Sequence, residues 1–153
     1  PGCEQILHVL RFSDAHGRLR GHVDGVIVCG PDGFHYPALW ENKCLGAKSW
    51  RELEAKGLAV AKPVYAAQVA LYQAHLQLHE HPALFTAINA DSMDIYVELV
   101  PFDGALAQRM TDRAVKVISA TEAGELLPRS FQDPTHFECR MCAWQERCWR
   151  KTA

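Results

Sequence analysis

The sequence predicts a mixed α/β domain with a central β-sheet flanked by helices. Segments rich in β-branched and aromatic residues, separated by short turn signals, occur at residues 5–45 and again at 83–102. Between and after them, residues 49–79 and 103–120 space their apolar side chains as amphipathic helices do. The 153 residues, 48% of them hydrophobic, are enough for one domain with a proper core.

The first part of the chain is expected to form three strands, at residues 5–12, 18–28 and 34–45. The turn signals 'SDAHG' and 'CGPDG' separate them. Pro37 in the third segment indicates a sheet edge or a bulge near the start of that strand, because proline has no N–H to donate.

Helices follow these strands. Residues 49–59 are predicted to be helical with Ser49 as the N-cap, because Glu52 three residues later completes a capping-box pattern. Residues 63–79 form the clearest helix and begin with a proline, which favours the first turn. The remaining elements are a hairpin at residues 83–102 that turns around 91–93, a helix at 103–120 and a polar, cysteine-bearing tail.

Composition limits the function classes. The net charge of −2 and the pI of about 6.5 argue against a protein that coats nucleic acid, but not against an enzyme with an acidic metal site. No apolar run approaches the length of a membrane span, and the N-terminus does not have the pattern of a secretory signal. We therefore expect a protein of the cell interior that has no membrane partner.

Charged residues in the apolar strand segments are the first functional signal. Residues two apart in a strand share a face, so Glu41 and Lys43 project together. Asp24 lies on the strand that the 'CGPDG' turn pairs with theirs, so the three side chains are expected to converge. Two carboxylates suit Mg²⁺ or Mn²⁺, to which a backbone carbonyl can add a ligand. An E-x-K pair is also common by chance, and a solvated strand face is the simpler interpretation of it taken alone.

A second signal lies on the helix at 63–79. Gln68 and Tyr72 are four residues apart and so share a face. By themselves they are ordinary helix residues, but their order after Asp24, Glu41 and Lys43 adds weight to the site.

Together these residues resemble the RecB-like nucleases of the PD-(D/E)XK superfamily. Gly21-His22-Val23-Asp24, Glu41-Asn42-Lys43 and Gln68-Val69-Ala70-Leu71-Tyr72 match in order the family's G-x-x-D, E-x-K and Q-x-x-x-Y motifs. The hairpin at 83–102 also looks like that of phage and CRISPR-associated members. The resemblance covers nearly the whole chain and implies a restriction-endonuclease-like core at residues 1–130, with a cysteine-rich tail at 131–153, in a single domain.

The resemblance also implies roles. Asp24 and Glu41 would bind the metal with the backbone carbonyl of Asn42, Lys43 would serve the attacking water, and Gln68 with Tyr72 would contact the scissile strand or steady the site. Family members usually carry a helix with a Glu or His before the first strand. No segment here supplies it, so we expect that helix to be absent from this sequence.

The tail 'FECRMCAWQERCW' contains Cys139, Cys142 and Cys148 in a C-x₂-C-x₅-C spacing. In a reducing compartment, this spacing favours ligation of a metal or cluster over a role as small core residues. In the resembling iron–sulfur nucleases an upstream cysteine completes a [4Fe-4S] cluster, a position that Cys3 could take. His136 offers a different fourth ligand, for a structural Zn²⁺. We expect Cys29 and Cys44 to be ordinary buried or free thiols.

The sequence therefore predicts a metal-dependent deoxyribonuclease, by resemblance an exonuclease acting on DNA with free ends in recombination, repair or phage replication. Its expected location is the cytoplasm of a bacterial cell or a phage-infected host, with a recombination or annealing protein as a further partner. The alternatives are a catalytically incomplete nucleic-acid-binding or scaffold module, and a zinc-stapled interaction domain whose E-x-K is accidental.

Overall fold

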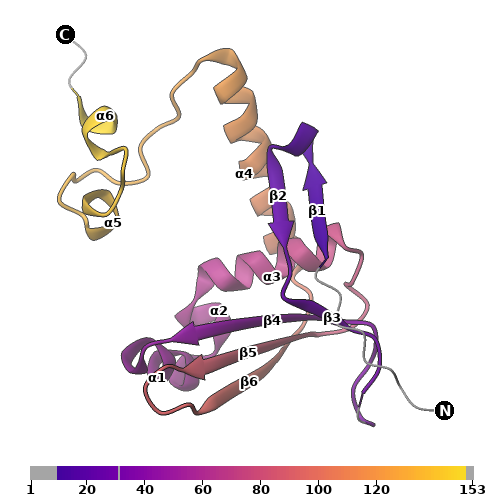
Figure 1. Cartoon of the computed structure of the whole chain (residues 1–153). Coiled ribbons are helices and arrows are strands. Elements are labelled where there is room, and N and C mark those ends of the chain that lie inside the picture. The colour runs from indigo at the N-terminus through magenta and orange to yellow at the C-terminus, as the bar shows by residue number, and fades with distance from the viewer. Residues whose placement is uncertain (1–9, 31, 151–153) are drawn as a thin grey trace. The chain divides into compact units, whose positions relative to one another are not determined.

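The computed structural model describes residues 10–30 and 32–150. The chain divides into two compact units, residues 1–115 and 116–153, and the boundary falls within one helix. In chain order the elements are β1 (Arg11–Asp14), the 3₁₀ turn η1 (Ala15–Gly17), β2 (Leu19–His22), β3 (Gly25–Ile27), β4 (Ala38–Leu45), α1 (Ala47–Lys56), α2 (Leu58–Ala61), α3 (Pro63–His75), β5 (Ala83–Asn89), β6 (Ile95–Val100), α4 (Gly104–Ala123), α5 (Phe137–Arg140) and α6 (Gln145–Trp149) (Figure 1).

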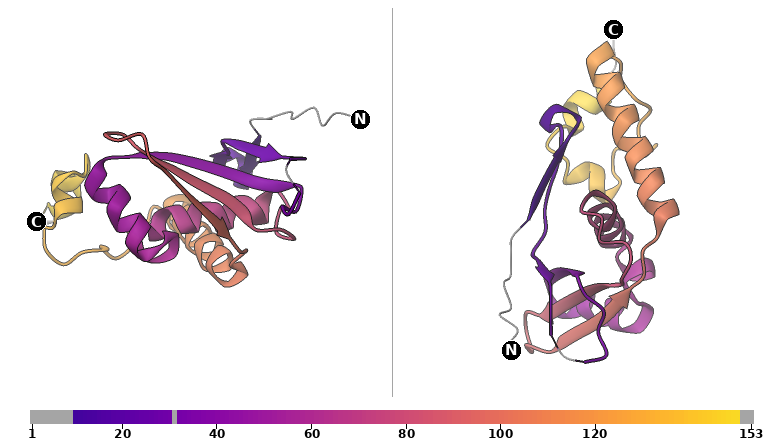
Figure 2. Two further views of the ribbon diagram at one scale, coloured as in Figure 1. Left: turned by 90° about the horizontal axis from the view of Figure 1, so that it is seen from below. Right: turned by 90° about the vertical axis from the view of Figure 1, so that its right-hand side faces the viewer.

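The predicted α/β class is confirmed at the level of a mixed sheet with helices packed against it. Four strands pair in the order β3-β4-β5-β6, and β1 with β2 forms a separate two-stranded sheet. β4 and β5 run parallel, whereas the β3–β4 and β5–β6 pairs are antiparallel. The helices α1, α2 and α3 connect the parallel pair, as a parallel crossover requires (Figure 2).

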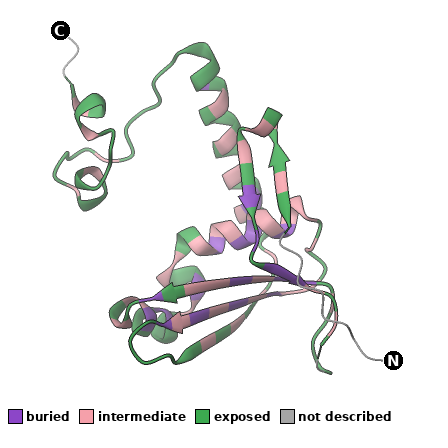
Figure 3. Ribbon diagram, viewed as in Figure 1, coloured by how far each residue is buried: buried purple, intermediate pink, exposed green. Residues whose placement is uncertain are grey.

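The core lies between the sheet and these helices. Leu39 of β4 and Phe85 of β5 are fully buried there, against Leu53, Leu58 and Val69 from α1, α2 and α3. Burial alternates along β5, as expected for a strand with one face on the core (Figure 3). The opposite face of β6 is exposed, and it carries Ile95, Val97 and Leu99.

The strand expected at residues 18–28 is wrong as a single element. It is divided into β2 and β3, which belong to different sheets, and the division falls at Val23 and Asp24. Val23 is 1% exposed and joins the core, while the Asp24 side chain bonds to β4 instead of continuing a strand ladder. Of the strand expected at 5–12, residues 5–9 lie outside the described residues, and β1 begins at Arg11. The third strand begins at Ala38, just after Pro37, which cannot donate to a ladder.

The predicted helix starts and ends also need correction. Ser49 is not the N-cap of α1: Gly46 is, and the N–H of Ala47 is satisfied by the Asp91 carboxylate at 3.1 Å. The N-cap therefore lies three residues earlier than the local capping box predicts. α3 ends at His75 rather than at residue 79, because Gln77 adopts a positive φ of 56°. The hairpin at 83–102 is confirmed as β5 and β6.

The β1–β2 hairpin packs on α3 through Phe12. The Phe12 ring meets Tyr72 edge-on at 5.6 Å between centroids and stacks on His75 at 4.4 Å. Gly21 faces Phe12 across the hairpin, and a Cβ there would lie 2.6 Å from both Phe12 Cζ and Tyr72 Cε1. The glycine of the G-x-x-D motif is thus required by close packing of two rings.

Gly21→Ala is expected to lower the free energy of unfolding by about 1–3 kcal/mol, because the added methyl group displaces these rings. Urea denaturation measures the change. The control is Gly46→Ala: a Cβ at Gly46 meets nothing within 4 Å, so only the smaller loss from replacing glycine at the N-cap of α1 is expected. Equal losses for the two variants would contradict the packing explanation.

Within residues 10–30 and 32–150, no helix combines the length and apolar character that a membrane crossing needs.

Candidate active site

The pairing of β3 with β4 brings Asp24 beside Glu41. Gly25 lies opposite Trp40 in this antiparallel pair, so the next position beyond the end of β3 sets Asp24 opposite Glu41. The Asp24 Oδ2 atom accepts a hydrogen bond of 2.7 Å from the backbone N–H of Asn42. The two carboxylates are close enough to repel each other electrostatically.

Glu41 projects from the core face of β4 and is 1% exposed. Its Oε1 atom accepts hydrogen bonds from the Lys43 ammonium group and from Gln68 Nε2, the latter at 2.9 Å. Its Oε2 atom is buried and has no hydrogen-bond partner among the described residues. A buried carboxylate oxygen without a partner is costly, which makes it a candidate for a ligand that the protein itself does not provide.

Lys43 is placed by its strand position and by an aromatic ring. It follows Glu41 by two residues and therefore projects from the same face of β4. Its Nζ atom lies 5.3 Å from the centroid of the Tyr65 ring on α3. The Lys43 side chain remains 20% exposed, so it is not enclosed in the core.

One face of α3 supports Glu41. Gln68 Nε2 donates both to Glu41 Oε1 and to the Tyr72 hydroxyl, at 2.9 Å in each case. Tyr72 lies one turn after Gln68, as the spacing of four residues predicts. Its ring also contacts Phe12 of β1, so the contacts run from the hairpin through α3 to the carboxylate.

Asn42 serves the site through its backbone. Its side chain points to the opposite face of the sheet, where its Oδ1 atom accepts a hydrogen bond from the Thr86 hydroxyl at 2.8 Å. Its N–H is directed at Asp24. Because the N–H and C=O of one residue in an extended strand point to the same side, the Asn42 carbonyl also faces the side of Asp24.

Burial raises the pKa of Glu41 above its ordinary value of 4.5, and the charge of Asp24 acts in the same direction. The hydrogen bond and the charge of Lys43 oppose this shift without cancelling it. The folded protein without a bound cation therefore favours the protonated form of Glu41 more than the unfolded chain does.

This raised pKa predicts a pH-dependent difference between the protein and Glu41→Gln. The stabilisation from a raised pKa is complete below the unfolded value of 4.5 and is lost as pH rises through the folded pKa. In buffers containing EDTA, Glu41→Gln is therefore expected to gain stability relative to the unmodified protein as pH rises from about 4.5 to 8. Urea denaturation across this range measures the difference. A difference independent of pH would contradict the shift.

The residues around Glu41 fit a hard divalent cation. The candidate donors would be the Glu41 Oε2 atom, the Asp24 carboxylate and the Asn42 carbonyl, all oxygens of the kind that Mg²⁺ and Mn²⁺ prefer. In the described part of the chain, no group of three or more His, Cys, Asp or Glu side chains is arranged to hold a metal ion. Two carboxylates and a carbonyl would leave the remaining positions to water, as is usual for Mg²⁺.

The predicted cysteine site is divided between described and undescribed residues. Cys3 lies outside the described residues. Cys139 in α5, Cys148 in α6 and Cys142 between them are free thiols and do not form a metal-holding group in the part that the structure describes. The Nδ1 atom of His136 accepts a hydrogen bond from the N–H of Glu138, so this atom caps α5. The tail as a metal or cluster site stays a prediction.

The remaining two cysteines differ from each other. Cys44 is a free thiol, as expected, although it is exposed rather than buried. Cys29 is disulfide-bonded, so its interpretation as a buried or free thiol was wrong. The position of Cys29 in a turn does not indicate from the sequence whether its thiol is free or forms a disulfide.

Tyr65 is the site residue that sequence reasoning missed. It lies three residues before Gln68 and seven before Tyr72, which puts all three on one face of α3. The sequence spacing places Tyr65 on the same helix face as Gln68 and Tyr72. It does not predict the contact with Lys43, because that contact depends on how α3 crosses β4.

No known family model matches the chain, and no curated protein matches it. A solved structure described as "Crystal structure of SSO0001" is similar, with a TM-score of 0.41 and 16% sequence identity over 74% of this chain and 49% of that one. This chain thus spans about half the length of that structure. A likeness of this size establishes neither fold family nor function.

Proposed function

We propose that this protein is a metal-dependent deoxyribonuclease of the RecB-like group in the PD-(D/E)XK superfamily, and that it hydrolyses DNA phosphodiester bonds from free ends. The observation that carries the proposal is the Glu41 carboxylate: one oxygen is held by Lys43 and Gln68, and the other is buried without a partner beside Asp24. The ordered motifs that suggested this family supply every residue of that arrangement.

A bound Mg²⁺ or Mn²⁺ ion would be held by Glu41, Asp24 and the Asn42 carbonyl, and it would polarise the phosphodiester and lower the pKa of a bound water. The burial of Glu41 supports this role. Burial raises the pKa of the carboxyl group, and a bound cation would stabilise its charged form.

Lys43 has two tasks in this proposal. It is a hydrogen-bond donor to Glu41, and its 20% exposure lets the same ammonium group reach a phosphate oxygen or the attacking water. Charge that develops on the phosphate in the transition state would be stabilised by an ammonium group already fixed in place. Tyr65 limits its freedom by lying against it.

Gln68 and Tyr72 are positioning residues. The Gln68 amide fixes one Glu41 oxygen, and the other oxygen, which has no partner among the described residues, would bind the cation. The Tyr72 hydroxyl accepts from the same amide nitrogen and so fixes the orientation of Gln68. Neither needs to contact the reacting phosphate to affect the rate.

We further propose that the tail binds a [4Fe-4S] cluster or, with His136, a structural Zn²⁺, in either case to stabilise the fold. The three free thiols at C-x₂-C-x₅-C spacing would be three of the four ligands. The N–H of Trp144 donates to Cys142 Sγ at 3.4 Å, and such contacts stabilise a thiolate ligand.

Cleavage of linear and of closed circular DNA of the same sequence tests the function. The proposal expects Mg²⁺- or Mn²⁺-dependent loss of the linear molecule alone, and no loss in EDTA. Cleavage of both forms would support a nuclease but would contradict the requirement for free DNA ends. If the folded protein cleaves neither DNA form, the nuclease proposal is wrong, and the alternative of a scaffold module with an incomplete site is favoured.

A further inference from the structure

The β1–β2 hairpin has two different faces. Arg11 pairs with His22 and Ser13 pairs with Arg20 across the two strands. Directly opposed residues, and residues two apart along a strand, share a face, so these four side chains lie together. All four are exposed. We call this surface the outer face of the hairpin.

The inner face is occupied by α3. It carries Phe12, packed on Tyr72 and His75, and Gly21, which leaves room for those rings. Asp14 Oδ2 also lies 3.9 Å from His75 Nδ1 on this side. The hairpin is thus fixed to α3 by one face, and the other face stays open to solvent.

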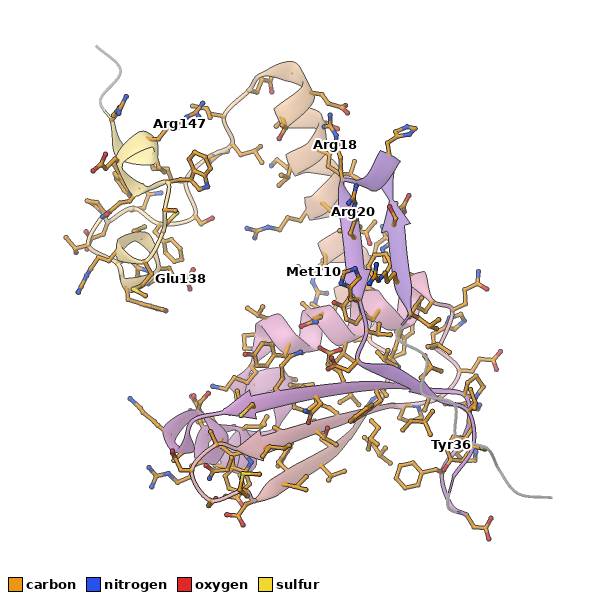
Figure 4. All side chains as sticks on the ribbon, viewed as in Figure 1. Arg18, Arg20, Tyr36, Met110, Glu138 and Arg147 are labelled. Carbon is orange, nitrogen blue, oxygen red and sulfur yellow. The ribbon has the colours of Figure 1, made fainter. Side chains whose placement is uncertain are left out.

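The outer face has the chemistry of a phosphate-binding surface. Arg11 and Arg20 supply two guanidinium groups, and Ser13 and His22 supply further polar side chains; none of the four is acidic. Arg20, labelled in Figure 4, donates its Nε–H to the Gly17 carbonyl at 2.6 Å, which holds the guanidinium beside the turn that joins the two strands. Half or more of protein–DNA hydrogen bonds go to the sugar-phosphate backbone, largely from such groups.

The hairpin is joined to the candidate active site by the chain on one side and by α3 on the other. Arg20 and His22 precede Asp24 by four and two residues on the same stretch of chain. In addition, Phe12 contacts Tyr72, whose hydroxyl is bonded to Gln68, which in turn holds Glu41. β2 ends at His22, two residues before Asp24, so the end of the hairpin adjoins the candidate active site along the chain.

We propose that the outer face of the β1–β2 hairpin binds the sugar-phosphate backbone of the DNA strand and guides it to the Glu41 site. This inference rests on the proposed function for the choice of DNA as the ligand. It adds a positively charged binding surface to a chain whose net charge is −2. The contacts are to phosphates, so the binding carries no sequence preference.

The test is binding of a fluorescein-labelled linear DNA in EDTA, where no metal-dependent cleavage occurs, across a series of salt concentrations. The variant is Arg11→Gln with Arg20→Gln. Its Kd is expected to rise by about tenfold or more, and the slope of log K against log salt is expected to become shallower by about 2. Arg11→Lys with Arg20→Lys keeps both charges and is expected to retain the slope.

The matched control is Arg109→Gln with Arg113→Gln, which removes two exposed arginines from α4, a helix that supplies none of the site residues. Equal Kd and slope for the hairpin variant and this control would overturn the inference, as would failure of the unmodified protein to bind the DNA. Urea denaturation checks that the hairpin variant is folded.

Cleavage, measured separately in Mg²⁺, distinguishes this inference from the proposed function. If cleavage depends on Glu41 but the hairpin variant binds DNA as the unmodified protein does, the proposed function stands and the hairpin surface is wrong. If the hairpin variant binds DNA more weakly but the unmodified protein does not cleave it, the hairpin surface stands and the nuclease proposal is wrong.

Discussion

Glu41→Gln is expected to reduce metal-dependent DNA cleavage by about 10²–10³-fold or more while leaving the fold intact. Glutamine has almost the same shape and can still accept the hydrogen bonds that Lys43 and Gln68 give to Oε1. It carries no charge, however, and it replaces the partnerless Oε2 atom by an NH₂ group that cannot bind a cation. The loss therefore isolates cation binding from packing.

Initial rates on linear DNA at saturating Mn²⁺ measure this effect. Glu54→Gln is the matched control, because Glu54 is an exposed carboxylate on α1 that is not part of the site. Glu54→Gln is expected to cleave DNA at the rate of the unmodified protein. Full activity in Glu41→Gln would show that the cleavage arises elsewhere.

Lys43→Met is expected to have a comparable effect, a loss of about 10²–10³-fold in the cleavage rate. Methionine keeps an unbranched apolar side chain against Tyr65 but removes the ammonium group that faces Glu41. Two consequences follow. The transition state loses a fixed positive charge, and Glu41 loses the neighbour that opposes the rise of its pKa.

The second consequence gives a distinct readout. Burial already raises the pKa of Glu41, and Lys43 lowers it, so removing Lys43 moves the pKa higher still. If cleavage needs the ionised carboxylate, the acid side of the pH–rate profile shifts to higher pH in Lys43→Met. Lys56→Met, an exposed lysine paired with Glu52, is the control and should leave the profile in place. A loss of rate without any shift would mean that Lys43 does not control the ionisation of Glu41.

Much of the candidate site could be placed from the sequence because its geometry is local. The period of two along a strand put Glu41 and Lys43 on one face of β4, and a spacing of four residues joined Gln68 to Tyr72 on α3. The hairpin signal placed Asp24 within reach of β4. These relations depend only on element type and turn position.

Other features depended on contacts between distant segments. The N-terminus of α1 is capped by Asp91, 44 residues from Ala47, so the local capping box at Ser49 predicted the wrong start. The division of residues 18–28 into β2 and β3 follows from Val23 entering the core. The almost complete burial of Glu41, and with it the raised pKa, required the packing of α3 over β4.

A titration with Mn²⁺ shows whether Glu41 and Asp24 hold a divalent cation, because bound Mn²⁺ loses the electron paramagnetic resonance signal of the free ion. A saturable Mn²⁺ site is expected in the unmodified protein and in Glu54→Gln, and its loss is expected in Glu41→Gln. Equal Mn²⁺ binding by all three proteins, or none by any of them, would contradict it.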